Sequence, residues 1–328
     1  MTRAIVLTAL CVVLAAATFA GAQVSIGGAQ SLYIQPGARP AGMGDCFASV
    51  AEDASACYWN PAGLAFMPVE KNLILMHSEL VPDWGDVYYE YAAYAQKVEG
   101  LGTLAGSVTY LTYGEQVATE EGSPDPIGTF NSYEVIPSIA YATTLTENIA
   151  LGINLKFIWV DLAPESVTFG QGEGSGTTFA GDLGVLYVVG DGRLRVGSAI
   201  QNVGPKIAYI DEEQSDPLPR NLKLGASYKI LDDEMNQLLY CAEYNKSLVI
   251  YEDFFDLSTG VIVNTGLEYT YYDLFSLRAG YVYDEDGEIK DFSYGLGLKY
   301  KDWAFDVASI PQAEGLKRPF RFSLSASF

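Results

Sequence analysis

The sequence has few charged residues and almost no histidine. Charged residues make up 18% of the 328 residues, whereas about a quarter is usual for a soluble chain. Only 19 basic residues stand against 41 acidic ones, giving a net charge of −22, so the basic footprint that nucleic-acid binding requires is absent. His77 is the single histidine, which excludes a multi-histidine metal site. No metal or cofactor is expected, and the sequence places no nucleophile beside His77, so we predict a protein without enzymatic activity.

A long hydrophobic run is missing after the first twenty residues. Arg3 is followed by a mostly apolar stretch and then by Ala20-Gly21-Ala22, the order of a secretory signal peptide with its cleavage site. We therefore expect residues 1–22 to be a signal peptide. The remainder has no second run of about 20 apolar residues, so no transmembrane helix is expected.

Alternating segments dominate the chain after residue 70. Within 151–159 the odd positions are Leu, Ile, Leu, Phe and Trp, and 292–300 alternates in the same way between large apolar and small or polar residues. A period of two indicates extended strands with one apolar face. Fourteen such segments follow one another, near 71–80, 87–97, 102–113, 132–143, 148–160, 178–189, 193–203, 219–230, 236–246, 259–271, 275–283, 290–300, 302–310 and 318–328.

The lengths of these segments and of their links indicate a membrane barrel. Most segments have nine to thirteen residues, whereas soluble strands have about five or six and tilted membrane strands about nine to eleven. Tight links alternate with long ones at 114–131, 161–177, 204–218 and 247–258, as in outer-membrane barrels. We predict an all-β fold, a transmembrane antiparallel barrel of about 14 strands over residues 70–328, located in the bacterial outer membrane after cleavage and in contact with its lipid.

The segment 23–69 differs from everything that follows it. Small residues lead to Asp53, a predicted N-cap for a short helix from Ala54 toward Trp59, and Asn60-Pro61 predicts a turn. We expect this segment to be a hatch inside the barrel, where it fills a lumen that wall side chains alone would leave open.

Three cysteines remain after the signal peptide, and two of them lie in the hatch. A disulfide between Cys46 and Cys57 would staple the hatch to itself. The alternative is that these two and Cys241 are small buried thiols.

The end of the chain alternates as well. Phe322, Leu324, Ala326 and Phe328 share one face of the segment RPFRFSLSASF. A last strand that ends on an aromatic residue is similar to the signal read by the bacterial barrel-assembly machinery, which is therefore an expected partner. The alternative is an ordinary edge strand.

The stretch GARPAGMGDCFASVAEDASACYWNPAGLA resembles the N-terminal signature of the PorV/PorQ family, which is related to FadL, the outer-membrane fatty-acid channel. The resemblance covers essentially the whole mature chain and implies a fourteen-stranded barrel with an internal hatch. The segment count agrees with this but is not independent of it. An Asn-Pro-Ala motif of the FadL-type hatch maps onto Asn60, Pro61 and Ala62, and Trp59 and Gly63 flank it. The two cysteines and the strong acidity depart from the family pattern.

The resemblance implies two different functions. Members like PorV serve type IX secretion, in which they accept secreted proteins through a C-terminal signal domain and bring them to the attachment machinery. Members like FadL let hydrophobic small molecules cross the outer membrane. We expect the first function and keep the second as the alternative. An apolar patch in a long loop suits an entrance or a protein partner, unless it only packs over the barrel mouth; it contains Leu248, Val249, Ile250, Tyr251, Phe254 and Phe255.

Overall fold

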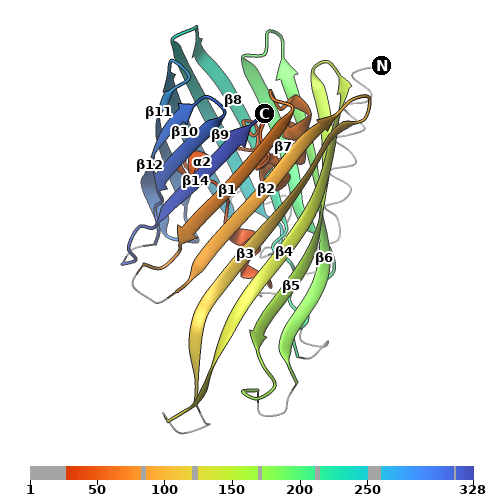
Figure 1. The fold of residues 1–328 in the computed structure, drawn as a ribbon, viewed down its shortest axis with the longest axis vertical. Coiled ribbons are helices and arrows are strands. Elements are labelled where there is room, and N and C mark those ends of the chain that lie inside the picture. Colours follow the sequence, from red (N-terminus) through yellow and green to blue (C-terminus); the bar gives the residue numbers. More distant parts are fainter. Residues whose placement is uncertain are drawn as a thin grey trace.

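The protein is a closed antiparallel barrel of fourteen strands in the computed structural model, which describes residues 27–82, 86–119, 125–168, 172–210, 215–249, 260–313 and 315–328 (Figure 1). Each strand pairs with its sequence neighbours, and β1 pairs with β14 to close the wall. The predicted fold and strand number are confirmed. The strands are β1 Lys71–Glu79, β2 Tyr88–Val98, β3 Gly102–Thr119, β4 Pro126–Thr146, β5 Ile149–Ala163, β6 Gly174–Val189, β7 Leu194–Val203, β8 Asn221–Asp232, β9 Asn236–Ser247, β10 Val261–Tyr271, β11 Phe275–Asp284, β12 Ile289–Tyr300, β13 Trp303–Ser309 and β14 Phe320–Ser327.

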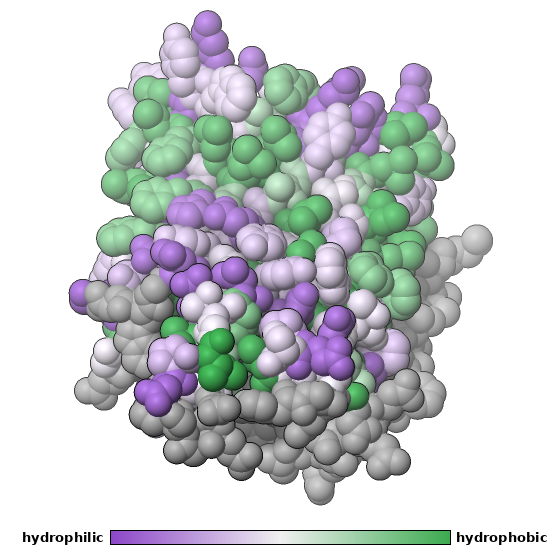
Figure 2. Space-filling view, turned by 60° about the horizontal axis from the view of Figure 1, so that its bottom comes forward, coloured by the Kyte–Doolittle hydropathy of each residue, from purple (hydrophilic) through white to green (hydrophobic). Residues whose placement is uncertain are grey.

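The wall has an apolar outer face and a polar or small inner face. On β5, Leu155, Phe157 and Trp159 are exposed, whereas the alternating residues Asn154 and Lys156 are buried. Hydrophobic side chains spread over the side of the barrel, with hydrophilic ones at its end (Figure 2). Such a face suits lipid, and the closed ladder satisfies the backbone groups that hydrocarbon cannot. No helix in the described ranges is long and apolar enough to span a membrane.

The four neighbouring strands β3, β4, β5 and β6 extend far beyond the rest at the long-loop end (Figure 1). The expected loop at 114–131 is wrong, because β3 continues to Thr119 and β4 begins at Pro126. The β3–β4 ladder crosses an irregularity between Thr112 and Glu115 and then resumes. Beyond the lipid both faces of a strand meet water, so the period-two pattern disappears from the sequence while the pairing persists.

The hatch lies inside the barrel and consists of four short elements. They are the 3-10 helix η1 Gln30–Tyr33, α2 Ala38–Gly42, α3 Ala56–Trp59 and the 3-10 helix η2 Pro61–Phe66. The helix predicted from Ala54 begins two residues later, with Ser55 at the N-cap position. Asp53 instead stabilises the preceding turn, where its Oδ1 accepts from the Ser55 amide at 2.9 Å. The predicted turn at Asn60-Pro61 is confirmed, since Asn60 caps η2 and Pro61 begins it.

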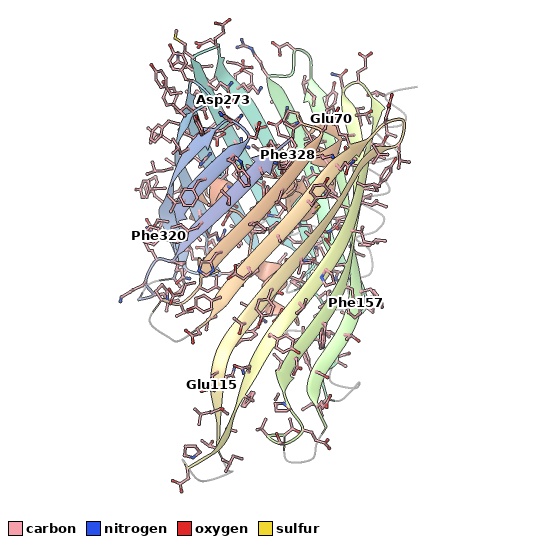
Figure 3. The ribbon with its side chains drawn as sticks, in the orientation of Figure 1. Glu70, Glu115, Phe157, Asp273, Phe320 and Phe328 are labelled. Atoms are coloured by element: carbon pink, nitrogen blue, oxygen red, sulfur yellow. The ribbon has the colours of Figure 1, made fainter. Side chains whose placement is uncertain are left out.

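The short turns and the chain end lie together at one end of the barrel, where Glu70, Asp273 and Phe328 are found (Figure 3). Phe320 and Glu115 lie toward the other end. Short turns face the periplasm in outer-membrane barrels, which orients the molecule. The hatch enters from the long-loop end, where the Gly28 amide donates to the Pro217 carbonyl at 3.0 Å, and leaves at the short-turn end into β1.

Candidate functional site

The inner wall supplies polar partners for the irregular backbone of the hatch. Short helices and turns leave many amides and carbonyls without partners, and burying such groups unpaired is costly. Side chains from around the barrel meet them. The wall partners are Asn72 to the Ala54 amide, Tyr89 to the Ile34 carbonyl, Gln201 to the Tyr58 carbonyl, Ser227 to the Ser49 carbonyl, Asn264 to the Gly44 carbonyl, Ser293 to the Gly44 amide and Ser323 to the Ala38 amide.

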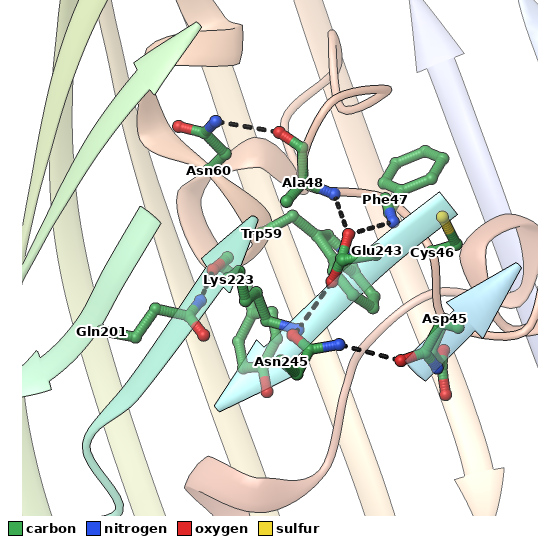
Figure 4. Close-up of polar contacts among 12 residues, drawn as sticks. Asp45, Cys46, Phe47, Ala48, Trp59, Asn60, Gln201, Lys223, Glu243 and Asn245 are labelled. Atoms are coloured by element: carbon green, nitrogen blue, oxygen red, sulfur yellow. Dashed lines mark hydrogen bonds and ion pairs between the residues drawn. The ribbon is translucent and has the colours of Figure 1, made fainter. Parts of the chain in front are cut away.

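Glu243 on β9 is the centre of a buried group of such contacts (Figure 4). Its Oε2 accepts from the amides of Phe47 and Ala48 at 2.8 and 2.6 Å. Its Oε1 lies 3.1 Å from Nζ of Lys223 on β8, and both side chains are almost completely buried. Lys223 also donates to Asn245 Oδ1 at 2.8 Å and lies 4.9 Å from the Trp59 ring centre. The pair therefore links two strands to two segments of the hatch.

Glu134 on β4 holds the start of the hatch in a similar way. Its carboxylate accepts from the amides of Gln30 and Ser31 at 3.0 and 2.9 Å and from the Ser31 hydroxyl at 2.6 Å. The Tyr113 hydroxyl donates to it at 2.6 Å. Four donors compensate a carboxylate that is 1% exposed.

The motif from Trp59 to Gly63 forms the packed centre of the hatch. Trp59 is fully buried, its Nε1 donates to the Pro36 carbonyl at 3.1 Å, and Phe47 contacts it edge to face. Asn60 Nδ2 donates to the Ala48 carbonyl at 2.8 Å and to the Val185 carbonyl of β6 at 3.1 Å, so one amide ties the hatch to itself and to the wall.

Two wall glycines make room for this motif. A Cβ on Gly184 would overlap Asn60 Oδ1 and lie 2.9 Å from Pro61 Cδ, and one on Gly152 would overlap the backbone of Pro61 and Ala62. The wall and the hatch are therefore shaped for each other along β5 and β6.

A cavity of about 450 Å³ lies between the hatch and the wall at the short-turn end. Ion pairs form part of its lining. Arg39 of α2 makes two hydrogen bonds to Glu268, at 2.9 and 2.7 Å, and Arg278 bridges Glu268 and Asp306, at 2.6 Å to each. Other polar residues of the lining include the serines of β14, Asn72 and the hatch residues Glu52 and Asp53.

No disulfide joins Cys46 and Cys57, and the cysteines of the described ranges are free and buried. The proposed staple is therefore wrong. Cys46 lies against β9, where Cys241 Sγ donates to its carbonyl at 3.1 Å, whereas Cys57 is on α3. Burial raises the pKa of the Cys46 thiol well above its ordinary value and that of Cys57 to about 12.

We predict that these cysteines do not react in the folded protein. Burial shields all three thiols from the reagent, and the raised pKa values of Cys46 and Cys57 also withhold the thiolate that reacts. Maleimide added to the folded protein in detergent should label none of Cys46, Cys57 and Cys241, and the same reagent after denaturation should label all three, as read by mass spectrometry. Rapid labelling before denaturation, or a mass lower by two hydrogens, would contradict this prediction.

The predicted loop patch is wrong for its first two residues. Leu248 and Val249 are buried, and the Leu248 amide donates to the Arg220 carbonyl at 2.9 Å. Ile250, Tyr251, Phe254 and Phe255 lie outside the described residues.

The predicted C-terminal face is the outward-facing side of β14. Phe322, Leu324 and Phe328 are exposed on it. Ala326 lies on the same face of β14 but is buried, because its neighbours across the strands are Leu73 on β1 and Trp303 on β13. Reading of this strand by the barrel-assembly machinery stays a prediction.

The charged residues inside the barrel are the functional side chains that composition alone did not single out. Glu134, Lys223, Glu243, Glu268 and Arg278 all lie on the inner face of their strands. The signal was present, because each falls on the polar side of a period-two segment. Within the described ranges, no three His, Cys, Asp or Glu side chains are grouped to hold a metal ion.

Comparisons with known proteins agree with this architecture. A family model described as type IX secretion system protein PorV matches residues 20–252. The toluene transporter TbuX of Ralstonia pickettii is 14% identical, with a TM-score of 0.56, over 89% of this chain and 98% of its own. A FadL homologue of Pseudomonas aeruginosa is 12% identical, with a TM-score of 0.51, over 89% and 97%. At such identities the likeness shows the fold alone. No curated protein matches.

Proposed function

The chain belongs to the PorV family of type IX secretion system proteins, and from that premise we propose that it carries exported proteins to the surface attachment machinery. It would recognise them by their C-terminal signal domain. The family match includes the hatch and strands β1 to β9. The outer-membrane barrel is the setting for this task. Removal of residues 1–22 on export is part of the proposal.

The filled lumen is the observation that carries this proposal. The hatch is held from many sides by buried wall side chains, among them Glu134, Glu243 and Glu268. A folded or threaded protein cannot pass such an interior, so cargo would be bound at the surface of the barrel. We also propose that the chain has no catalytic role. His77 is on the outer face of β1, half exposed, with Glu90 at 2.6 Å and the Tyr88 ring beside it.

A hydrophobic channel is the second candidate. It is favoured by a gap in the β4–β5 pairing of the wall at Pro137. Pro137 has no amide hydrogen, and the β4–β5 ladder skips it and Ile136. Ile136 also lines a small cavity inside the wall at this point. That cavity measures only about 10 Å³, room for about one water molecule, so a hydrocarbon would pass only if the hatch moved.

We expect mass spectrometry on the native protein, extracted from its own outer membrane in mild detergent, to separate these functions. A carrier should co-purify with secreted proteins that share a C-terminal domain. An unrelated outer-membrane barrel carrying the same affinity tag is the control for adventitious capture. Hydrophobic small molecules without such proteins would instead support the channel.

A further inference from the structure

The cavity at the short-turn end has the features of a ligand site, whatever the role of the chain in secretion. It opens toward the periplasm, because Gln237, Asp273 and Lys299 beside the short turns line it together with Val69 at the end of the hatch. Its volume of about 450 Å³ is within the range of small-molecule sites. The cavity would therefore accept a side chain or a small molecule but not a folded domain.

The floor of the cavity is a neutral, rigid network. Arg39 and Arg278 balance Glu268 and Asp306, with separations of 2.6 to 2.7 Å in the three ion pairs. The network packs directly against Gly297 of β12, where only glycine fits. A Cβ on Gly297 would lie 2.5 Å from Asp306 Oδ1 and 2.8 Å from an Arg278 nitrogen. This floor keeps the space above it open and contributes no net charge.

Asp53 is the carboxylate in the lining without a basic partner. Glu52 pairs with Arg195 at 2.6 Å and Asp273 with Lys299 at 2.6 Å. Among the described residues no lysine, arginine or histidine nitrogen lies within 4.0 Å of Asp53. Its Oδ1 is occupied by the Ser55 amide and hydroxyl, at 2.9 and 2.5 Å. Burial raises its pKa, although Arg39 lowers it, so the negative charge of Asp53 is only partly compensated.

The rest of the lining combines apolar surface with hydroxyl groups. Pro68, Val69 and Ile74 supply apolar contacts, and Ser325 and Thr270 supply hydroxyls. A small inorganic ion would leave the apolar surface unused, and an anion would meet the unbalanced carboxylate. An organic cation with an apolar stem satisfies both features, because its stem packs on the apolar surface while its charge reaches Asp53.

We propose that this cavity is a periplasm-facing site for an organic cation, an ammonium or guanidinium group on an apolar stem, with Asp53 as its counter-charge. A lysine or arginine side chain of a periplasmic peptide and a free alkylamine share this chemistry. The ion-pair floor of Arg39, Glu268, Arg278 and Asp306 positions the site and does not bind the charge.

The test is calorimetric titration of the full chain in detergent with three probes: acetyl-Leu-Arg-amide, its neutral match acetyl-Leu-Gln-amide, and cadaverine. We expect saturable binding of the arginine peptide and none of the glutamine peptide. Binding of cadaverine as tightly as the arginine peptide would identify a free amine as the ligand source, and tighter binding of the peptide would identify a peptide segment. Absence of saturable binding by either cation, or equal binding of the Arg and Gln peptides, would overturn the proposal.

Variants connect the binding to Asp53. Asp53→Asn keeps the oxygen that accepts from Ser55 and should weaken cation binding at least tenfold. Asp302→Asn removes one negative charge from the neighbouring β12–β13 turn, outside the cavity lining, and should leave binding unchanged. Ser325→Phe fills the cavity with Asp53 intact and should abolish binding. Equal losses in Asp53→Asn and Asp302→Asn would show a general charge effect and contradict the site.

Discussion

Replacing Glu243 by alanine is expected to lower the free energy of unfolding by about 3–5 kcal/mol, the usual cost of removing one partner from a buried ion pair. The change leaves Lys223 charged and buried, and it removes the acceptor of the Phe47 and Ala48 amides. Urea unfolding in detergent, followed by tryptophan fluorescence, measures the loss, and Trp59 in the hatch reports directly on this region.

Two controls separate the buried pair from ion pairs in general. Asp273→Asn breaks the exposed pair with Lys299, in which the side chains are 65% and 45% exposed, and should change the stability by less than about 1 kcal/mol. The double variant Glu243→Gln with Lys223→Met removes both charges, keeps an amide-oxygen acceptor and should be more stable than Glu243→Ala. If Glu243→Ala were no less stable than Asp273→Asn, the proposed clamp on the hatch would be wrong.

Replacing Gly184 by alanine is expected to dislodge the hatch from its seat. The new methyl group would overlap Asn60 Oδ1 and press on Pro61, at the residue that ties the hatch to β6. Overpacking of this kind costs about 1–3 kcal/mol. Thermolysin should cleave the hatch several-fold faster than in the unmodified protein, and planar bilayers should show current steps as the lumen opens.

Gly181→Ala is the matched control on the same strand. A Cβ at Gly181 meets nothing closer than a Leu155 methyl group at 3.7 Å, so the hatch should keep its resistance to cleavage and the bilayer should stay silent. If the two variants were cleaved at the same rate and gave the same bilayer current, the absence of a side chain at Gly184 would not be what seats the hatch.

The sequence by itself determined the wall, because a membrane strand repeats the same physical demand at every second residue. Segments such as 151–159 and 292–300 show this alternation directly, and the parity of the links orders the strands into a barrel. Asn60-Pro61 likewise predicted its turn from local chemistry, since Pro61 restricts the residue before it.

Only the tertiary structure decided what the hatch does and which wall residues hold it. Glu134, Glu243 and Glu268 lie far from the hatch in sequence, with 103 residues separating Ser31 from Glu134, and no local pattern pairs a carboxylate with a distant backbone amide. The same holds for Cys46, which faces Cys241 instead of Cys57. Barrel closure brings these groups together, and the exclusion of water inside it makes each polar contact necessary.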